Sequence, residues 1–139
     1  MLKILIGVVG VVATTLAILQ GVNVHISSAS HPERTDFVFS AHQTHSRQIT
    51  FRPSRGNIRA AGTQIAGSTP TTYGLRRALN NGAMTRIATI TISTNNARSS
   101  TNVLLGTQNA TLTNQFRVDM VRDTPRASAN TFRLFAFIQ

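Results

Sequence analysis

A long apolar segment near the N-terminus constrains this chain more than any other feature. Residues 4–24 carry no charged side chain, and the first two thirds of this stretch are almost purely apolar. Twenty-one residues in an α-helix would measure roughly 30 Å, close to the hydrocarbon thickness of a bilayer. The residues that follow are polar, rich in arginine and strand-like in pattern. The sequence therefore predicts an apolar helix over residues 1–24, a linker over 25–35 and one exposed domain over 36–139.

Three roles are open to the apolar segment. The basic Lys3, the apolar middle and the small residues at Ser28–Ser30 fit a cleaved signal peptide. The same apolar length fits an uncleaved membrane anchor, and it also fits a helix that packs against copies of itself in an assembly. We expect one of the last two, which would leave the chain anchored in a membrane or held in a virion or surface filament.

Small residues recur through this segment at the spacing of a helix–helix contact. On a helix, residues three and four apart share one face, and small side chains there let a second backbone approach closely. We therefore predict a helix-packing face made of Gly7, Gly10, Ala13 and Ala17.

The charge balance is strongly basic. Fourteen Lys and Arg face four Asp and Glu, which gives a formal net charge of +10, and no acidic residue occurs between Phe37 and Arg117. Such a surface attracts nucleic acid, anionic lipid or an acidic protein, although a bias towards arginine that serves only solubility is the alternative. The candidate polyanion-binding residues are Arg47, Arg52, Arg55, Arg59, Arg76 and Arg77.

Alternating apolar and polar residues in the exposed domain predict β-strands. A Gly-, Ser- and Thr-rich stretch over 60–72 predicts a surface loop, and Thr72 with Asn81-Gly82 would cap and end a short helix over 73–79. The last strand is apolar on both sides and is expected to be covered on both. The expected strands are 36–40, 48–52, 85–93, 102–105, 110–121 and 131–138. Strands in this number favour a small mainly-β domain, an antiparallel sandwich or barrel.

The chain shows no set of residues typical of catalysis or of a cofactor site. There is no cysteine, no GxSxG or SxxK nucleophile pattern and no glycine-rich phosphate loop. Four histidines fall close together, and His42 and His45 have HxxH spacing, but they lie in loop-like sequence without an obvious fourth ligand. We expect no enzyme activity, no metal site and no cofactor.

The layout as a whole predicts a structural protein. An apolar N-terminal helix ahead of a small β domain resembles two groups, the single-anchor proteins of lipid-containing virions and the pilin-like subunits of filaments. Type IV pilins carry Glu at the fifth mature position, where this chain has Leu5. We expect a subunit of an ordered assembly whose partners are its own copies or other structural subunits, with membrane lipid. The alternative is a membrane-tethered basic module that binds nucleic acid or anionic lipid.

Overall fold

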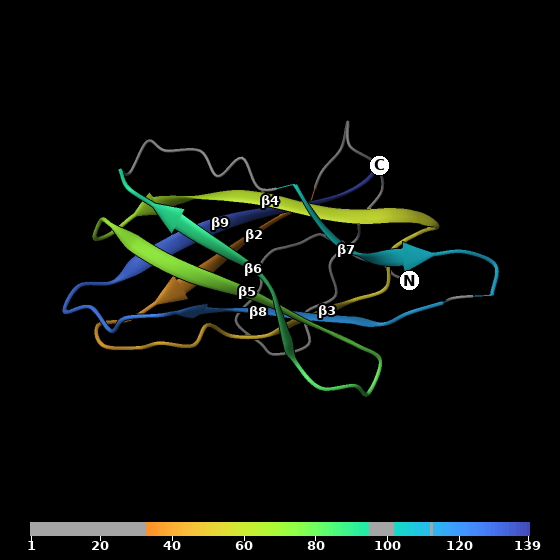
Figure 1. Cartoon of the computed structure of the whole chain (residues 1–139), viewed down its shortest axis with the longest axis horizontal. Coiled ribbons are helices and arrows are strands. Elements are labelled where there is room, and N and C mark those ends of the chain that lie inside the picture. The colour runs from red at the N-terminus through yellow and green to blue at the C-terminus, as the bar shows by residue number, and fades with distance from the viewer. Residues whose placement is uncertain (1–32, 95–101, 112) are drawn as a thin grey trace.

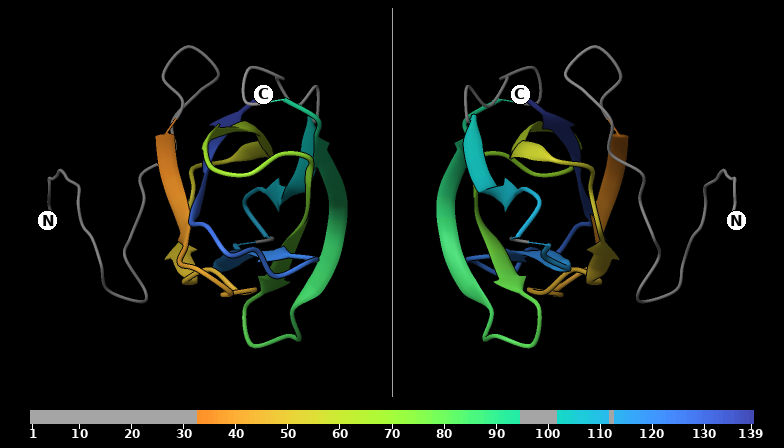
Figure 2. Two further views of the ribbon diagram at one scale, coloured as in Figure 1. Left: turned by 90° about the vertical axis from the view of Figure 1, so that its left-hand side faces the viewer. Right: turned by 90° about the vertical axis from the view of Figure 1, so that its right-hand side faces the viewer.

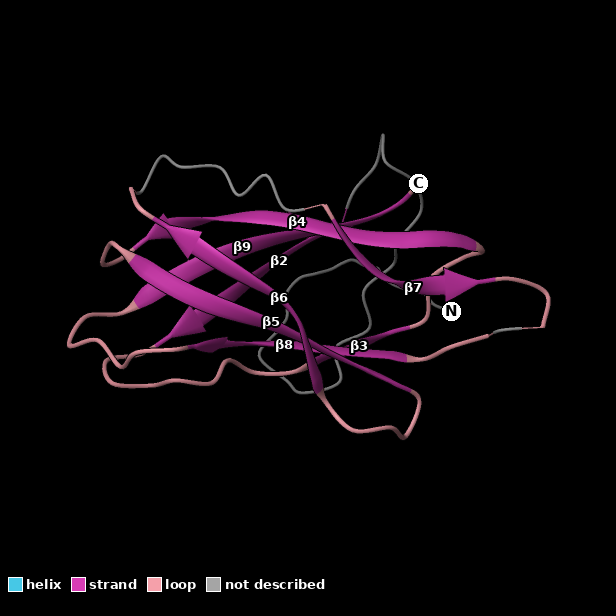
Figure 3. Ribbon diagram, in the orientation of Figure 1, coloured by secondary structure: helices cyan, strands magenta, loops and turns pink. Residues whose placement is uncertain are grey.

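The computed structural model describes residues 33–94, 102–111 and 113–139, and within them it contains eight strands and no helix (Figures 1 and 3). The strands are β2 (Glu33–Phe39), β3 (Ile49–Phe51), β4 (Gly56–Ala66), β5 (Thr71–Leu79), β6 (Thr85–Ile92), β7 (Val103–Gln108), β8 (Phe116–Arg122) and β9 (Asn130–Ile138).

The strands form two four-stranded sheets in which every neighbouring pair is antiparallel. One sheet has the order β2-β9-β4-β7 and the other β3-β8-β5-β6. The view along the strands shows the two sheets facing each other (Figure 2). The chain changes sheet at every connection except that between β5 and β6. Eight antiparallel strands wound between two sheets in this order form a jelly roll.

The core lies between the two sheets and is filled with aromatic and aliphatic side chains. The inward residues of β2, Phe37 and Phe39, are fully buried. Tyr73 of β5 joins the sheets, because its ring lies 5.5 Å from that of Phe39 and 5.0 Å from that of Phe132 on β9. Each large apolar side chain buried here contributes about 1.5–3 kcal/mol to folding. The described interior is thus packed with side chains.

Several predicted strands are confirmed. Those over 36–40 and 48–52 are β2 and β3, and those over 85–93 and 131–138 are β6 and β9. β2 begins at Glu33, inside the predicted linker. The strand expected at 102–105 is β7, which extends to Gln108. That expected over 110–121 begins only at Phe116, and the residues before it connect β7 to β8.

The helix predicted over 73–79 is wrong, because these residues form β5. Thr71, Tyr73 and Leu75 alternate into the core, a period of two that outweighs the helical spacing of the remaining residues. Asn81-Gly82 belongs to the turn between β5 and β6, and Asn80 there has a φ of 55°. Asn tolerates the left-handed conformation better than most residues and is therefore common in turns.

The surface loop predicted over 60–72 is confirmed only for residues 67–70, since β4 continues to Ala66 and β5 begins at Thr71. The small and polar residues that suggested a loop have tertiary roles. A Cβ at Gly62 would lie 2.6 Å from the Phe132 ring, so only glycine fits there. Gln64 is fully buried, where its side-chain oxygen accepts hydrogen bonds from Tyr73 and Asn130. Interactions of this kind leave no mark in a local sequence window.

The last strand was expected to be covered on both sides. Its inward side is buried, and on its outward side Phe135 and Phe137 are only partly covered. The predicted helix over 1–24, with its packing residues Gly7, Gly10, Ala13 and Ala17, lies outside the described residues, as does most of the predicted linker. Within residues 33–94, 102–111 and 113–139, no helix is long and apolar enough to cross a membrane.

Candidate interaction faces

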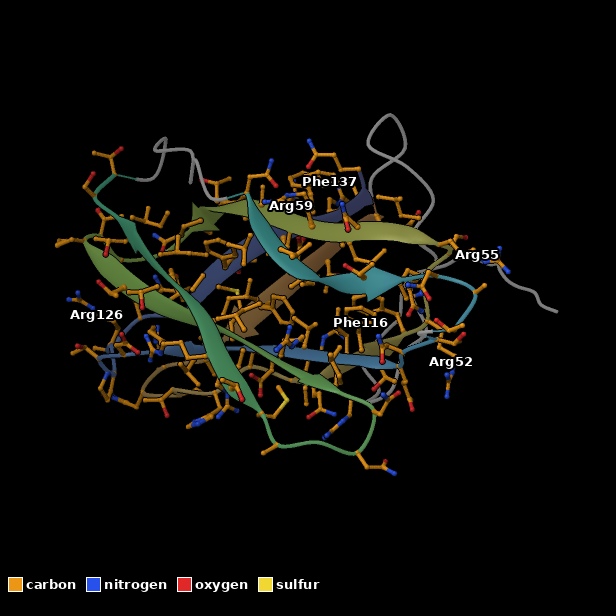
Figure 4. The ribbon with its side chains drawn as sticks, turned by 45° about the vertical axis from the view of Figure 1, so that its right-hand side comes forward. Arg52, Arg55, Arg59, Phe116, Arg126 and Phe137 are labelled. Atoms are coloured by element: carbon orange, nitrogen blue, oxygen red, sulfur yellow. The ribbon has the colours of Figure 1, made fainter. Side chains whose placement is uncertain are left out.

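The structure separates the six arginines predicted to bind a polyanion. Arg52 and Arg55 lie in the connection between β3 and β4 at one end of the domain, and Arg59 follows on β4 (Figure 4). Arg52 and Arg55 are exposed and have no hydrogen-bond or carboxylate partner among the described residues. Arg59 donates two hydrogen bonds to Asn102, a neutral partner that leaves its positive charge uncompensated.

The other three predicted arginines are held by the protein. Arg76 makes a two-pronged ion pair with Asp119, with N–O distances of 2.6 and 2.8 Å, and this carboxylate raises the pKa of Arg76. Arg77 donates to the carbonyl of Leu105 in the opposite sheet, and its Nε is buried without a partner. Arg47 is half-buried, and burial lowers its pKa although Asp36 acts in the opposite sense. Sequence spacing does not show which way a side chain points, and the structure directs these three arginines towards partners within the domain or into partial burial.

Arg122 is the structural residue that sequence reasoning missed. It is only 1% exposed, although arginine is seldom buried without a carboxylate partner. Its guanidinium makes five hydrogen bonds, all to neutral oxygens. The acceptors are the carbonyls of Ser40, Gln43 (twice) and Ser128 and the side-chain oxygen of Asn130.

These bonds use every donor of the guanidinium and tie the β2–β3 connection to the β8–β9 connection. The guanidinium carbon also lies 5.5 Å from the centre of the Phe39 ring. Burial lowers the pKa of Arg122. Arg122 therefore closes one end of the core. The only sequence signal was an arginine at an inward position of β8, two residues after Met120.

The outer side of the β3-β8-β5-β6 sheet is polar, and we call it the polar face. It consists of Thr50, Thr72, Gly74, Arg76, Ala78, Arg86, Thr89, Thr91, Arg117, Asp119 and Val121, which register places together. A second ion pair lies on it, because Arg86 binds Asp123 in the same two-pronged way at 2.5 and 3.1 Å. A Cβ at Gly74 would lie 2.4 Å from the guanidinium carbon of Arg86, so glycine there lets Arg86 lie across the sheet.

A shallow hollow of about 390 Å³ opens beside this face. It is lined by Thr44, His45, Arg76, Arg86, Val121, Arg122 and Asp123. Its two surface arginines are already paired with carboxylates, and His45 is hydrogen-bonded to Thr44 over 3.0 Å. Among the described residues no three His, Cys, Asp or Glu side chains converge as metal ligands would, and His25 and His31 lie outside them. The hollow thus offers hydrogen-bonding groups whose charges are already compensated.

The outer side of the β2-β9-β4-β7 sheet is different, and we call it the apolar face. It consists of Arg34, Asp36, Val38, Arg59, Ala61, Thr63, Ile65, Leu104, Thr131, Arg133, Phe135 and Phe137. Val38, Ile65 and Leu104 are 53%, 40% and 46% exposed, and they are the large exposed hydrophobic residues of the described chain. All three lie on this one side of the domain. This placement makes the apolar face a candidate contact surface.

Comparison with known proteins adds little. No family model matches the sequence, and no curated protein matches it. One solved structure is similar, that of PliG from Aeromonas hydrophila, a periplasmic inhibitor of g-type lysozyme. The two are 13% identical, with a TM-score of 0.38, and the match covers 85% of this chain and 100% of that chain. A likeness at this level carries no argument about function.

Proposed function

We propose that this chain is a structural subunit of an ordered assembly, a coat protein of a virion whose jelly-roll domain forms the shell. The strand order β2-β9-β4-β7 with β3-β8-β5-β6 is the observation that supports this most. Jelly rolls recur in viral capsids, and also in lectins and cupins. Because one fold serves several functions, the site must discriminate among them.

The interior favours the coat protein over the ligand-binding uses of the fold. The space between the sheets is occupied by Phe37, Phe51, Phe116 and Phe132, each at most 1% exposed. The two outer faces favour it too, since one sheet presents a threonine-rich surface on which two of three arginines are paired with aspartates, and the other presents an apolar surface. A subunit in a shell has unlike surroundings on its two sides. The predicted apolar helix would hold the subunit to its neighbours or to an enclosed membrane.

Density-gradient sedimentation of the full chain, with and without mild detergent, followed by electron microscopy of the peak, tests the proposal. We expect large regular particles. Loss of the particles in detergent would assign residues 4–24 a lipid setting, and persistence would assign them a protein setting. A small species under every condition would contradict the proposal. A chain lacking residues 1–24 is the matched variant, and we expect it to stay unassembled.

A further inference from the structure

The apolar face carries positive charge as well as partly exposed aromatic rings. Arg34, Arg59 and Arg133 lie on it, and among the described residues its carboxylate is that of Asp36. Arg133 neutralises Asp36 through hydrogen bonds of 2.9 and 3.0 Å. Glu33 lies at the opposite parity of β2 and belongs to the other side of the sheet. Two positive charges, those of Arg34 and Arg59, are therefore left uncompensated on this face.

Each uncompensated charge lies next to an aromatic ring. Phe135 is paired in register with Arg34 on one side and with Ala61 on the other. Phe137 is paired with Arg59, and Figure 4 shows both on the same side of the domain. The two rings are two residues apart on β9, so their Cα atoms are separated by about 7 Å along the strand. The face thus carries the same pair twice, a partly exposed ring next to an arginine.

We infer that the apolar face binds single-stranded nucleic acid, with bases stacked on Phe135 and Phe137 and phosphates at Arg34 and Arg59. A basic surface with aromatic rings in sequence is how proteins bind single strands without reading sequence. Unpaired bases offer the rings a flat apolar partner, while a duplex keeps its bases stacked on each other. Leu104, paired in register with Arg59, extends the apolar area beside Phe137.

Charge disfavours a second copy of this chain as the occupant. Two copies packed through this face would bring Arg34 and Arg59 of each into a shared, partly desolvated contact. Like charges placed together in an interface oppose association. An anionic lipid surface satisfies the cations, but it has no flat ring to stack on the two phenylalanines. The inference goes beyond the proposed function, because one subunit in detergent solution can bind the strand without forming a particle.

The test is fluorescence anisotropy of a labelled (dT)20 oligonucleotide with the full chain in a neutral detergent. We expect binding that weakens as salt rises, and at least fivefold weaker binding of a 20-base-pair duplex. Phe135→Leu with Phe137→Leu keeps apolar bulk but removes the rings, and it should weaken (dT)20 binding at least about tenfold, because each stacked base contributes about 1–3 kcal/mol. Arg34→Gln with Arg59→Gln should reduce the slope of log K against log salt by about 1.4.

Arg52→Gln is the matched control, because it removes an exposed unpaired arginine away from the apolar face. It should change affinity for (dT)20 less than twofold. Circular dichroism establishes that each variant is folded, and Phe135→Tyr with Phe137→Tyr, which keeps both rings, should bind like the parent.

Three results would overturn the inference: equal affinity for single strand and duplex, unchanged binding by the leucine variant, or binding to phosphatidylglycerol vesicles without binding to (dT)20. Particles that form without (dT)20 binding would defeat this inference and leave the proposed function standing, and binding without particles would do the reverse.

Discussion

The two outer faces of this domain are made by sheets of equal strand number and opposite chemistry. On the polar face threonines alternate with core residues. Two of its three arginines, Arg76 and Arg86, are paired with aspartates, and the third, Arg117, donates to the carbonyls of Asn80 and Gly82. On the apolar face, Val38, Ile65 and Leu104 are exposed, and two arginines lack a carboxylate. A sheet face that only meets water normally alternates apolar-in with polar-out, as the polar face does. The apolar face departs from this pattern, and we therefore propose it as the side that meets a partner.

The largest expected effect comes from removing the buried guanidinium of Arg122, which closes one end of the core between the two sheets. Arg122→Met removes five hydrogen bonds and leaves four oxygens at the end of the core without this donor, and we expect it to lower the free energy of unfolding by at least about 3 kcal/mol. Arg77→Met is the matched control, because Arg77 is also inward-facing but makes one hydrogen bond and leaves its Nε unpartnered. It should change stability by less than about 1 kcal/mol. Denaturant unfolding followed by circular dichroism measures both, and equal losses would contradict this account of Arg122.

Alkaline pH tests the contribution of the buried Tyr73, whose side chain joins the two sheets. Burial raises the pKa of Tyr73 to about 12, while in the unfolded chain it is about 10. The folded protein therefore holds the phenolic proton over a range where the unfolded chain releases it. This contribution to stability is complete below pH 10 and is lost between pH 10 and 12, about 2–3 kcal/mol in all. Unfolding curves across that range measure it.

The control for this pH dependence is Tyr73→Phe, which cannot ionise. It should lose the hydrogen bond to Gln64 at every pH and show a flatter stability profile between pH 10 and 12. If the parent and the variant decline in parallel over this range, another group is responsible.

A smaller effect compares one ion pair on each face. The carboxylate of Asp119 on the polar face is 8% exposed, and that of Asp36 on the apolar face is 34% exposed. A charge-assisted hydrogen bond is worth more when shielded from water, so Asp119→Asn should cost about 1–3 kcal/mol and Asp36→Asn less than about 1 kcal/mol. Thermal unfolding of the two variants measures both losses. A larger loss for Asp36→Asn than for Asp119→Asn would contradict the account.

The smallest effect on stability, and the sharpest contrast between the faces, comes from exchanging their surfaces. Val38→Thr, Ile65→Thr and Leu104→Thr together should change stability by less than about 0.5 kcal/mol per site and reduce retention on a hydrophobic column. Thr72→Val, Thr89→Val and Thr91→Val on the polar face form the mirror variant, which should be retained more strongly. If the first variant were retained as strongly as the parent, the exposed apolar residues of this face would not contribute to hydrophobic binding.

Sequence patterns predicted those parts of the fold where burial alternates plainly, as in Thr85–Ile92 and Asn130–Ile138. They failed over β4 and β5, where Gly62 and Gln64 read as loop residues because their partners lie on β9 and β5, far along the chain. The strand order of the jelly roll depends on long-range pairings that no local window contains.

The functional surface was predicted only in outline. Net charge showed that cations exceed acids, but the pairing of Arg76 with Asp119 and the inward direction of Arg77 follow from β5 being a strand. Phe135 and Phe137 were expected to lie under cover because the last strand is apolar on both sides. Only the register with Arg34 and Arg59 shows that cations flank these rings.

The central claim is that one outer face is built for a partner and the other for water. The most direct test is carbene labelling of the full chain in the assembly that we propose and again after its dissociation. Mass spectrometry would locate the label along β9 and β4 on the apolar face and along β6 and β5 on the polar face. The account predicts that assembly sharply reduces labelling of the peptides containing Phe135, Phe137 and Ile65, while labelling around Thr89 and Thr91 changes little. Equal protection of both faces, or protection of the polar face alone, would contradict it.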